Sequence, residues 1–188
     1  MRTIQDFLAY FRRQRSWTRT LVAAVPEEHF HWRPAADAFS CGELVRHLIQ
    51  SEVFWRRMLL EGAEGRSFDP FGLTGTGLER MTAFRRRNLA SSGGDKYGTS
   101  FAGLLETWSG IQAQTEEHLS RISPEQLASA ELEHPLLTMR APLWEMLLTM
   151  VGHEVHHRGQ LSAYLKAIGA EQPASLHRSP EPLSEPIS

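Results

Sequence analysis

Three of the nine histidines of this chain, His153, His156 and His157, lie within five consecutive positions. If this stretch is helical, His153 and His157 project from one face about 40° apart, because an α-helix turns by about 100° per residue. Two imidazoles at this spacing can bind one metal ion. The spacing alone favours a metal site and a chance cluster of histidines about equally. We interpret His156 as a neighbour of the pair that supports it.

Residues 153–157 also match the HExxH signature of zinc proteases, in which the glutamate acts as a general base. The extended signature continues with a glycine and a third histidine, but Gln160 and Ala163 occupy those positions here. The glutamates beyond residue 170 lie too close to the end of the chain to supply a convincing third ligand. A zinc protease is therefore the less favoured alternative.

Four segments with apolar residues at helical spacing must position these side chains. They cover about residues 3–24, 44–62, 101–122 and 142–169. Four long amphipathic helices bury their apolar faces most economically against one another. We therefore predict an all-α fold, a four-helix bundle, in which inward side chains of facing helices can build a metal site.

The second predicted helix carries another histidine on its inward face. Ser40 and Glu43 have the spacing of a capping box immediately before it, and His47 belongs to its apolar stripe. Three imidazoles inside a bundle would be costly as unpaired polar groups, whereas one divalent metal ion would satisfy all three. Three protein nitrogens also leave a coordination position open, which is typical of catalytic metal sites.

The remaining segments are less regular. Residues 62–100, rich in glycine, form an irregular insert between the second and third helices, with a short helix over residues 78–89. We predict an extended crossover or a short hairpin over residues 128–141. A bundle domain is expected over residues 1–170, followed by an extended or disordered tail over residues 171–188, which are rich in proline and serine.

Composition and charge argue against several classes of function. The net charge of −2 gives no field that would attract nucleic acid or an anionic membrane, and the basic run at residues 85–87 is expected to be a solvated face. No apolar stretch is long enough for a membrane helix, and no signal-peptide pattern is visible. The single cysteine, Cys41, fits a reducing cytoplasm. We expect a cytoplasmic protein that acts on a small molecule.

Three motifs resemble the DinB-like (YfiT-like) superfamily. They are W-R-P at residues 32–34, E-L-V-x-H-L at residues 43–48 and H-x-x-x-H-R-G-Q at residues 153–160. The resemblance covers residues 1–169 in order and spacing. It implies a four-helix bundle, commonly a homodimer, that binds a divalent metal such as zinc or nickel through one histidine of the second helix and two of the fourth.

Carried over by position, the resemblance implies that His47, His153 and His157 bind this metal. The family is described as metal-dependent hydrolases, and relatives include thiol S-transferases that use bacillithiol-type cofactors and a mycothiol-dependent isomerase. A metal held by three neutral ligands can activate either a water molecule or a thiolate. A hydrolase and a low-molecular-weight-thiol S-transferase therefore both remain open, and a metal-binding stress-response or interaction module without turnover is the alternative.

Three charged residues are candidates for a catalytic role. Glu43 could reach the mouth of the pocket, although the capping box explains it better. Glu154 lies about 100° from His153 around the helix and is expected to face outward or sideways. Arg158 follows a predicted ligand and is either an ion-pair partner or an anion contact. Cys41 lies near a helix N-terminus, but a buried and inert thiol is the favoured interpretation.

Overall fold

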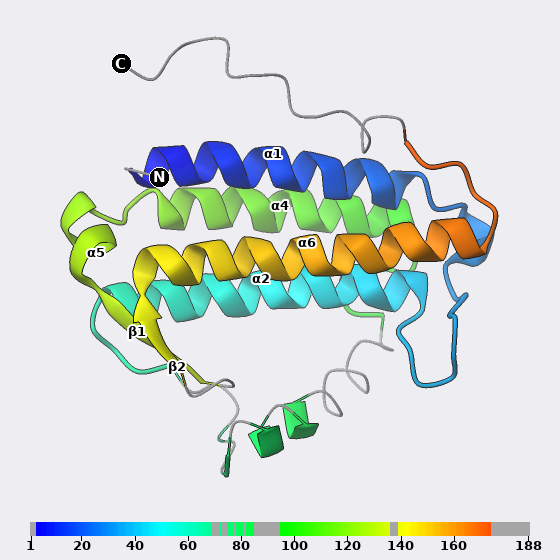
Figure 1. Cartoon of the computed structure of the whole chain (residues 1–188). Helices are drawn as coiled ribbons and strands as arrows, with labels where there is room; N and C mark the ends of the chain where they lie inside the picture. The colour runs from blue at the N-terminus through cyan, green and yellow to red at the C-terminus, as the bar shows by residue number, and fades with distance from the viewer. Residues whose placement is uncertain are drawn as a thin grey trace.

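Four long helices form a bundle in the computed structural model (Figure 1). The helices are α1 (Ile4–Ala23), α2 (Cys41–Ala63), α4 (Phe101–Leu119) and α6 (Leu143–Ala167). The structure describes residues 3–68, 72, 75–76, 78–80, 82–84, 95–135 and 139–173. Helices α1 and α2 each pack against both α4 and α6, so α1 and α2 lie diagonally opposite each other. The predicted all-α four-helix bundle is confirmed.

The residues at the helix ends determine where α2 and α6, the helices that carry the histidines, begin and end. The Ser40 side chain accepts a hydrogen bond from the backbone of Glu43, and the Glu43 side chain accepts one from the backbone of Ser40. This capping box satisfies N–H groups that the first turn of α2 cannot use internally. Helix α6 starts directly after Pro142 and ends before Gly169, whose φ of 72° lies in the left-handed region that glycine adopts readily.

The segment between α4 and α6 holds one predicted element and one that was not predicted. Strands β1 (Glu131–His134) and β2 (Met139–Pro142) pair antiparallel, which agrees with the short-hairpin interpretation. The third predicted helix was too long, because α4 ends at Leu119 and a separate helix α5 (Pro124–Ser129) follows. A capping box between Ser123 and Gln126 starts α5.

Several predictions fall partly outside the described residues. Within the short helix predicted over residues 78–89, positions 78–80 and 82–84 are helical, and the others lie outside the description. The basic run at residues 85–87 and positions 174–188 of the predicted tail also lie outside it. In the part of the chain that is described, no helix has the length and apolar character needed to span a membrane.

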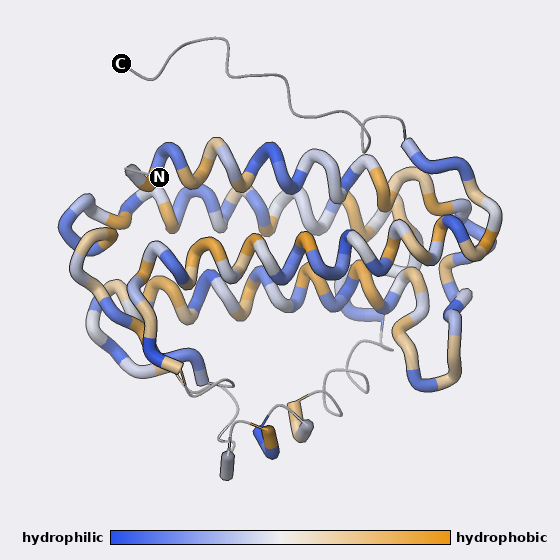
Figure 2. The backbone as a smooth tube through the Cα atoms, in the orientation of Figure 1, coloured by the Kyte–Doolittle hydropathy of each residue, from blue (hydrophilic) through white to orange (hydrophobic). Residues whose placement is uncertain are grey.

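The apolar core is divided into two clusters. One contains Phe7, Met58 and Leu147, and the other contains Leu44 and Leu161. Hydrophobic and hydrophilic residues alternate along every long helix, as Figure 2 shows. Between the two clusters, each long helix contributes buried polar side chains. They are Gln14, Arg15, Thr18, His47, Glu52, Thr115, Glu154 and His157. We call this set the polar layer.

Candidate metal centre

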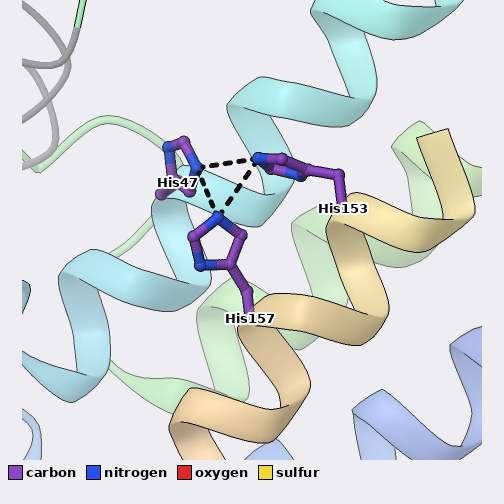
Figure 3. A group of neighbouring side chains, drawn as sticks. All are labelled: His47, His153 and His157. Atoms are coloured by element: carbon purple, nitrogen blue, oxygen red, sulfur yellow. Dashed lines mark hydrogen bonds between the residues drawn. The ribbon is translucent and has the colours of Figure 1, made fainter. Parts of the chain in front are cut away.

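One imidazole from α2 and two from α6 meet at the polar layer (Figure 3). Nε2 of His47 lies 3.3 Å from Nε2 of His153 and 3.1 Å from Nε2 of His157, and the last two atoms are 3.1 Å apart. His47 and His157 are buried, whereas His153 is partly exposed. The structure therefore brings together the three histidines that the sequence singled out.

This triangle of nitrogens has the dimensions of a metal site. In a tetrahedral zinc site the Zn–N distances of about 2.0–2.1 Å place ligand nitrogens about 3.3–3.4 Å apart. Hydrogen bonds cannot account for all three contacts. A neutral imidazole nitrogen is either a donor or an acceptor, so among three such atoms at least two are alike. A divalent cation would accept a lone pair from each.

Burial keeps the three imidazoles neutral at neutral pH. It lowers the pKa of His47 to about 3, of His153 to about 2 and of His157 to about 4. Mutual repulsion among the neighbouring histidines lowers these pKa values further, while a hydrogen bond to Gln160 opposes the shift of His157. Neutral imidazole is the form that binds metal ions. The cluster is therefore in its metal-binding protonation state.

Gln160 fixes the tautomer of His157. Its Oε1 lies 2.7 Å from Nδ1 of His157, and because an amide oxygen can only accept, Nδ1 donates. The lone pair of His157 is then on Nε2, which faces the other two histidines. The Gln160 amide nitrogen lies 3.3 Å from Nε2 of the exposed His156, so His156 supports the pair indirectly. Sequence reasoning gave Gln160 no role, although its position one turn after His157 was a usable signal.

Two neighbours flank His47. The Ser51 hydroxyl lies 3.4 Å from His47 Nε2, one helical turn further along α2. The Phe39 ring stacks on the imidazole with a centroid distance of 5.0 Å and an interplanar angle of 19°. These contacts restrict the orientation of the His47 ring, as a metal ligand requires.

Glu154 is buried and points toward α1, so the predicted outward orientation is wrong and the sideways one agrees with the structure. Its carboxylate accepts two hydrogen bonds from Arg15 Nε, at 3.1 and 3.2 Å, and one from Arg15 Nη2 at 2.9 Å. The physical reason is the packing of α6, which contacts α1 as well as α2. The turn of about 100° from His153 to Glu154 moves the side chain from the face toward α2 to the face toward α1.

Arg15 also binds a second buried carboxylate. Glu52 Oε2 accepts a hydrogen bond from Arg15 Nη1 at 2.6 Å and another from Trp108 Nε1 at 2.6 Å. Burial alone would lower the pKa of Arg15, but Glu154 and Glu52 raise it above its usual value. Arg15, Glu52 and Glu154 form what we call the buried trio, with a formal charge of −1. Glu52 was missed because a lone polar residue within an apolar stripe gives no indication of its partners.

The other two catalytic candidates have structural partners. Glu43 caps α2, and its Oε1 accepts a hydrogen bond from Arg33 at 3.1 Å. Arg158 donates to the backbone oxygen of Gln14 at 3.1 Å and to its side-chain oxygen at 3.0 Å, and its guanidinium lies over the Trp17 ring. These contacts agree with capping for Glu43 and give Arg158 an interhelix role.

The thiol of Cys41 is unsuited to nucleophilic chemistry. It is buried at the start of α2, and burial raises its pKa to about 11. A thiol with such a pKa carries almost no thiolate at neutral pH. The interpretation of Cys41 as a buried, inert residue agrees with this environment.

The sequence model that describes the DinB superfamily matches residues 10–161 of this chain, and these residues include all three histidines. The chain belongs to the DinB superfamily. Membership accounts for the order of the motifs on α2 and α6, and it confirms the resemblance of residues 32–34, 43–48 and 153–160 to this family.

Relatives in the DinB superfamily span nearly the whole chain. The uncharacterized protein YjoA of Bacillus subtilis (strain 168) is 24% identical over 164 residues, which are 87% of this chain and 90% of that protein. The crystal structure of the DinB-like YjoA from Bacillus subtilis matches with a TM-score of 0.61 at 21% identity, over 89% of this chain and 94% of that one. A DinB-like protein from Bacillus cereus ATCC 10987 matches with a TM-score of 0.62 at 16% identity, over 92% and 97% of the two chains. These likenesses show a shared fold.

Proposed function

We propose that this DinB-superfamily protein is a metal-dependent enzyme in which His47, His153 and His157 hold one divalent ion, zinc or nickel. The observation that supports this most directly is the triangle of Nε2 atoms 3.1–3.3 Å apart. Three protein ligands leave a coordination position open, as in catalytic zinc sites. The partial exposure of His153 marks the side from which a small molecule would reach that position.

Activation of a low-molecular-weight thiol is the reaction that the surrounding residues favour. A bound divalent ion supplies Lewis acidity that makes a coordinated thiol or water anionic. The nearest carboxylates suggested by the sequence, Glu43 and Glu154, are held by other groups, so the ion must act on the nucleophile without their help. A thiol, with a pKa of about 8.5, needs much less help than water, at about 15.7. We therefore place S-transfer from such a thiol first and metal-dependent hydrolysis second.

The zinc-protease alternative conflicts with the position of Glu154. In the HExxH arrangement this glutamate is the general base beside the metal-bound water. Here three hydrogen bonds tie its carboxylate to Arg15, and it is 4% exposed. Cleavage of casein that disappears in Glu154→Gln would support the protease, whereas no cleavage by the wild type ends that alternative.

The metal content of the purified protein and of its histidine variants tests the proposed metal site. We expect about one divalent ion per chain in purified protein by elemental analysis, and loss of that ion in His47→Ala and in His157→Ala. His156→Ala is the matched control, because it removes an exposed histidine from the same helix outside the triangle. Full metal retention in both ligand variants would refute the assignment.

Activity assays separate the reactions. Metal-loaded protein is given a low-molecular-weight thiol with an aryl halide electrophile, and in separate reactions ester and amide substrates. We expect thiol-dependent turnover that is lost in His157→Ala. Ester or amide hydrolysis alone would favour the hydrolase, and bound metal without turnover in any assay would favour the stress-response or interaction module.

We also propose that the protein is a cytoplasmic homodimer whose subunits meet through the outer face of α6. Trp144, Leu148 and Val155 are 44%, 40% and 37% exposed and lie on this face. Two α6 helices that pair antiparallel about the midpoint between Val151 and Gly152 would place Leu148 against the partner's Val155. They would also place Trp144 over the partner's Gly159, where no atom fills the space that a Cβ would occupy.

A further inference from the structure

Glu52 has a buried carboxylate oxygen for which the described residues provide no hydrogen-bond partner. The residue is 3% exposed, and its Oε2 already accepts from Arg15 and Trp108. Its Oε1 is the unpartnered atom. Leaving a buried acceptor unsatisfied costs about 1–3 kcal/mol, and more for a charged group. Buried polar atoms in native proteins are therefore almost always hydrogen-bonded, often to an ordered water molecule.

A small cavity lies beside this carboxylate. Its polar wall consists of Arg15, Ser51, Glu52, His153 and Glu154, and apolar side chains of α2 and α6 complete it. The space open to the centre of a water molecule is about 10 Å³. That volume corresponds to about one water molecule. It is too small for a substrate.

His153 borders this cavity and also the histidine triangle. Its Nε2 faces His47 and His157, so a lone pair on Nε2 requires the proton to be on Nδ1. Histidines that bind metals almost always donate this second N–H to a carboxylate, a carbonyl or a water molecule. Gln160 accepts that proton for His157. Among the described residues, none accepts the corresponding proton of His153.

We propose that one water molecule in this cavity connects His153 to Glu52. The Nδ1–H of His153 donates to the water oxygen, and the water donates to Glu52 Oε1. Glu52 is thus a positioning residue that acts on the metal site through His153. The link supplies the missing partner of Glu52 and holds the His153 lone pair on Nε2. Its effect on metal binding rests on the proposed function, whereas the hydrogen bonds themselves do not.

Glu52→Gln and Glu154→Gln form a matched pair of variants. Each removes one formal negative charge from a carboxylate that binds Arg15, so the two variants share the same loss of charge. Only Glu52 has the unpartnered oxygen, because both oxygens of Glu154 accept hydrogen bonds from Arg15. A difference between the variants therefore reports on the link to His153 and not on the loss of charge.

The first measurement is the tautomer of His153 in metal-free protein, read from its ¹⁵N chemical shifts. We expect the proton on Nδ1 in the wild type and in Glu154→Gln, and a mixture of tautomers in Glu52→Gln. An unchanged His153 tautomer in Glu52→Gln would overturn the inference. Because no metal is present, this result does not depend on the proposed function, which fails instead if the wild type binds no divalent ion.

The second measurement is the zinc dissociation constant by competition with a chelator. We expect zinc binding to weaken about 10- to 100-fold in Glu52→Gln, as is usual when a partner of a metal-binding histidine is removed. Glu154→Gln should remain close to the wild type, and an equal loss in both variants would overturn the inference. If Glu52→Gln does not fold, a high-resolution crystal structure of the wild type decides, since an empty cavity contradicts the water link and one water density between Glu52 and His153 supports it.

Discussion

Protonation of individual histidines affects both the stability of the fold and the ability of the histidine triangle to hold a metal ion. Burial lowers the pKa of His47, His153 and His157 to about 3, 2 and 4, and that of His134 to about 4. An unfolded histidine titrates near pH 6.5. Between these values the unfolded chain binds more protons than the folded one, so the free energy of unfolding decreases as the pH falls.

We therefore expect metal-free protein to lose stability steadily from about pH 6.5 down to about pH 4. Urea unfolding followed by circular dichroism at several pH values measures this slope. His134→Phe is the control, because His134 packs against Trp55 outside the triangle. This variant should reduce the slope and leave zinc affinity at neutral pH unchanged. A free energy of unfolding that is constant between pH 7 and pH 4.5 would contradict the prediction.

A spacing of four predicted that His153 and His157 would share a helix face, and the apolar stripe of the second helix together with the family resemblance added His47. The environment of Glu154 could not be predicted in this way. Its direction depends on α1 packing against α6, which is a property of the assembled bundle. The same holds for Glu52, whose two partners lie on α1 and α4.

At the scale of a helix, a capping box stabilises the start of α2, the helix that carries His47. The capping box lies two turns before His47, and Ser40 is itself buried. Because Glu43 belongs to this cap, we infer that its carboxylate stabilises α2 and takes no part in the proposed reaction. This distinction can be measured with two variants.

Ser40→Ala should lower the free energy of unfolding by about 1 kcal/mol, since it removes the acceptor for an N–H of the first turn. Denaturant unfolding measures this change. Glu43→Gln should have a smaller effect, because glutamine is also found at this position of capping boxes. Both variants should retain the metal and the wild-type turnover. A large loss of turnover in Glu43→Gln, with the metal still bound, would instead give Glu43 a catalytic role.

Long helices were easier to predict than short elements, because apolar periodicity becomes clear only over several turns. The four bundle helices have that length. Helix α5 has 6 residues and shows no such pattern, so only its capping box and Pro124 could have revealed it. The weak apolar alternation over residues 128–141 left a crossover and a short hairpin open, and in the structure Leu132 and His134 are the buried positions of β1.

At the scale of the molecule, the buried trio connects α1, α2 and α6 at the polar layer. The buried Arg15 cation compensates the charges of both carboxylates, and they compensate its charge. Removing Arg15 leaves two buried negative charges without compensation, which is more costly than the loss of the pair itself.

We expect Arg15→Met to lower the free energy of unfolding by about 3–5 kcal/mol. Arg12→Met is the control, because Arg12 is exposed and pairs with Glu116 at the surface, where such a pair contributes about 0–1 kcal/mol. Thermal and urea unfolding measure both variants. Similar small changes in the two would show that the buried trio does not stabilise the bundle.

The proposed dimer makes a separate prediction. Leu148→Glu places a charge at the centre of the exposed apolar face of α6 and should convert the dimer to a monomer. Ala113→Glu adds the same charge to an exposed position of α4 and should leave the dimer intact. Light scattering after size-exclusion chromatography gives the mass of each. A wild-type protein that is monomeric at micromolar concentration, or a dimer that survives Leu148→Glu, would exclude this interface.

The histidine triangle also bears on the order of events in folding. His47 and His153 are 106 positions apart in the chain and belong to two different helices. An ion that needs both can bind fully only after α2 and α6 have met, when the long loop between them is already closed. Where α2 and α6 meet only after the transition state, such an interaction stabilises the native state more than the transition state. The ion would therefore mainly lower the rate of unfolding and would change the rate of folding little.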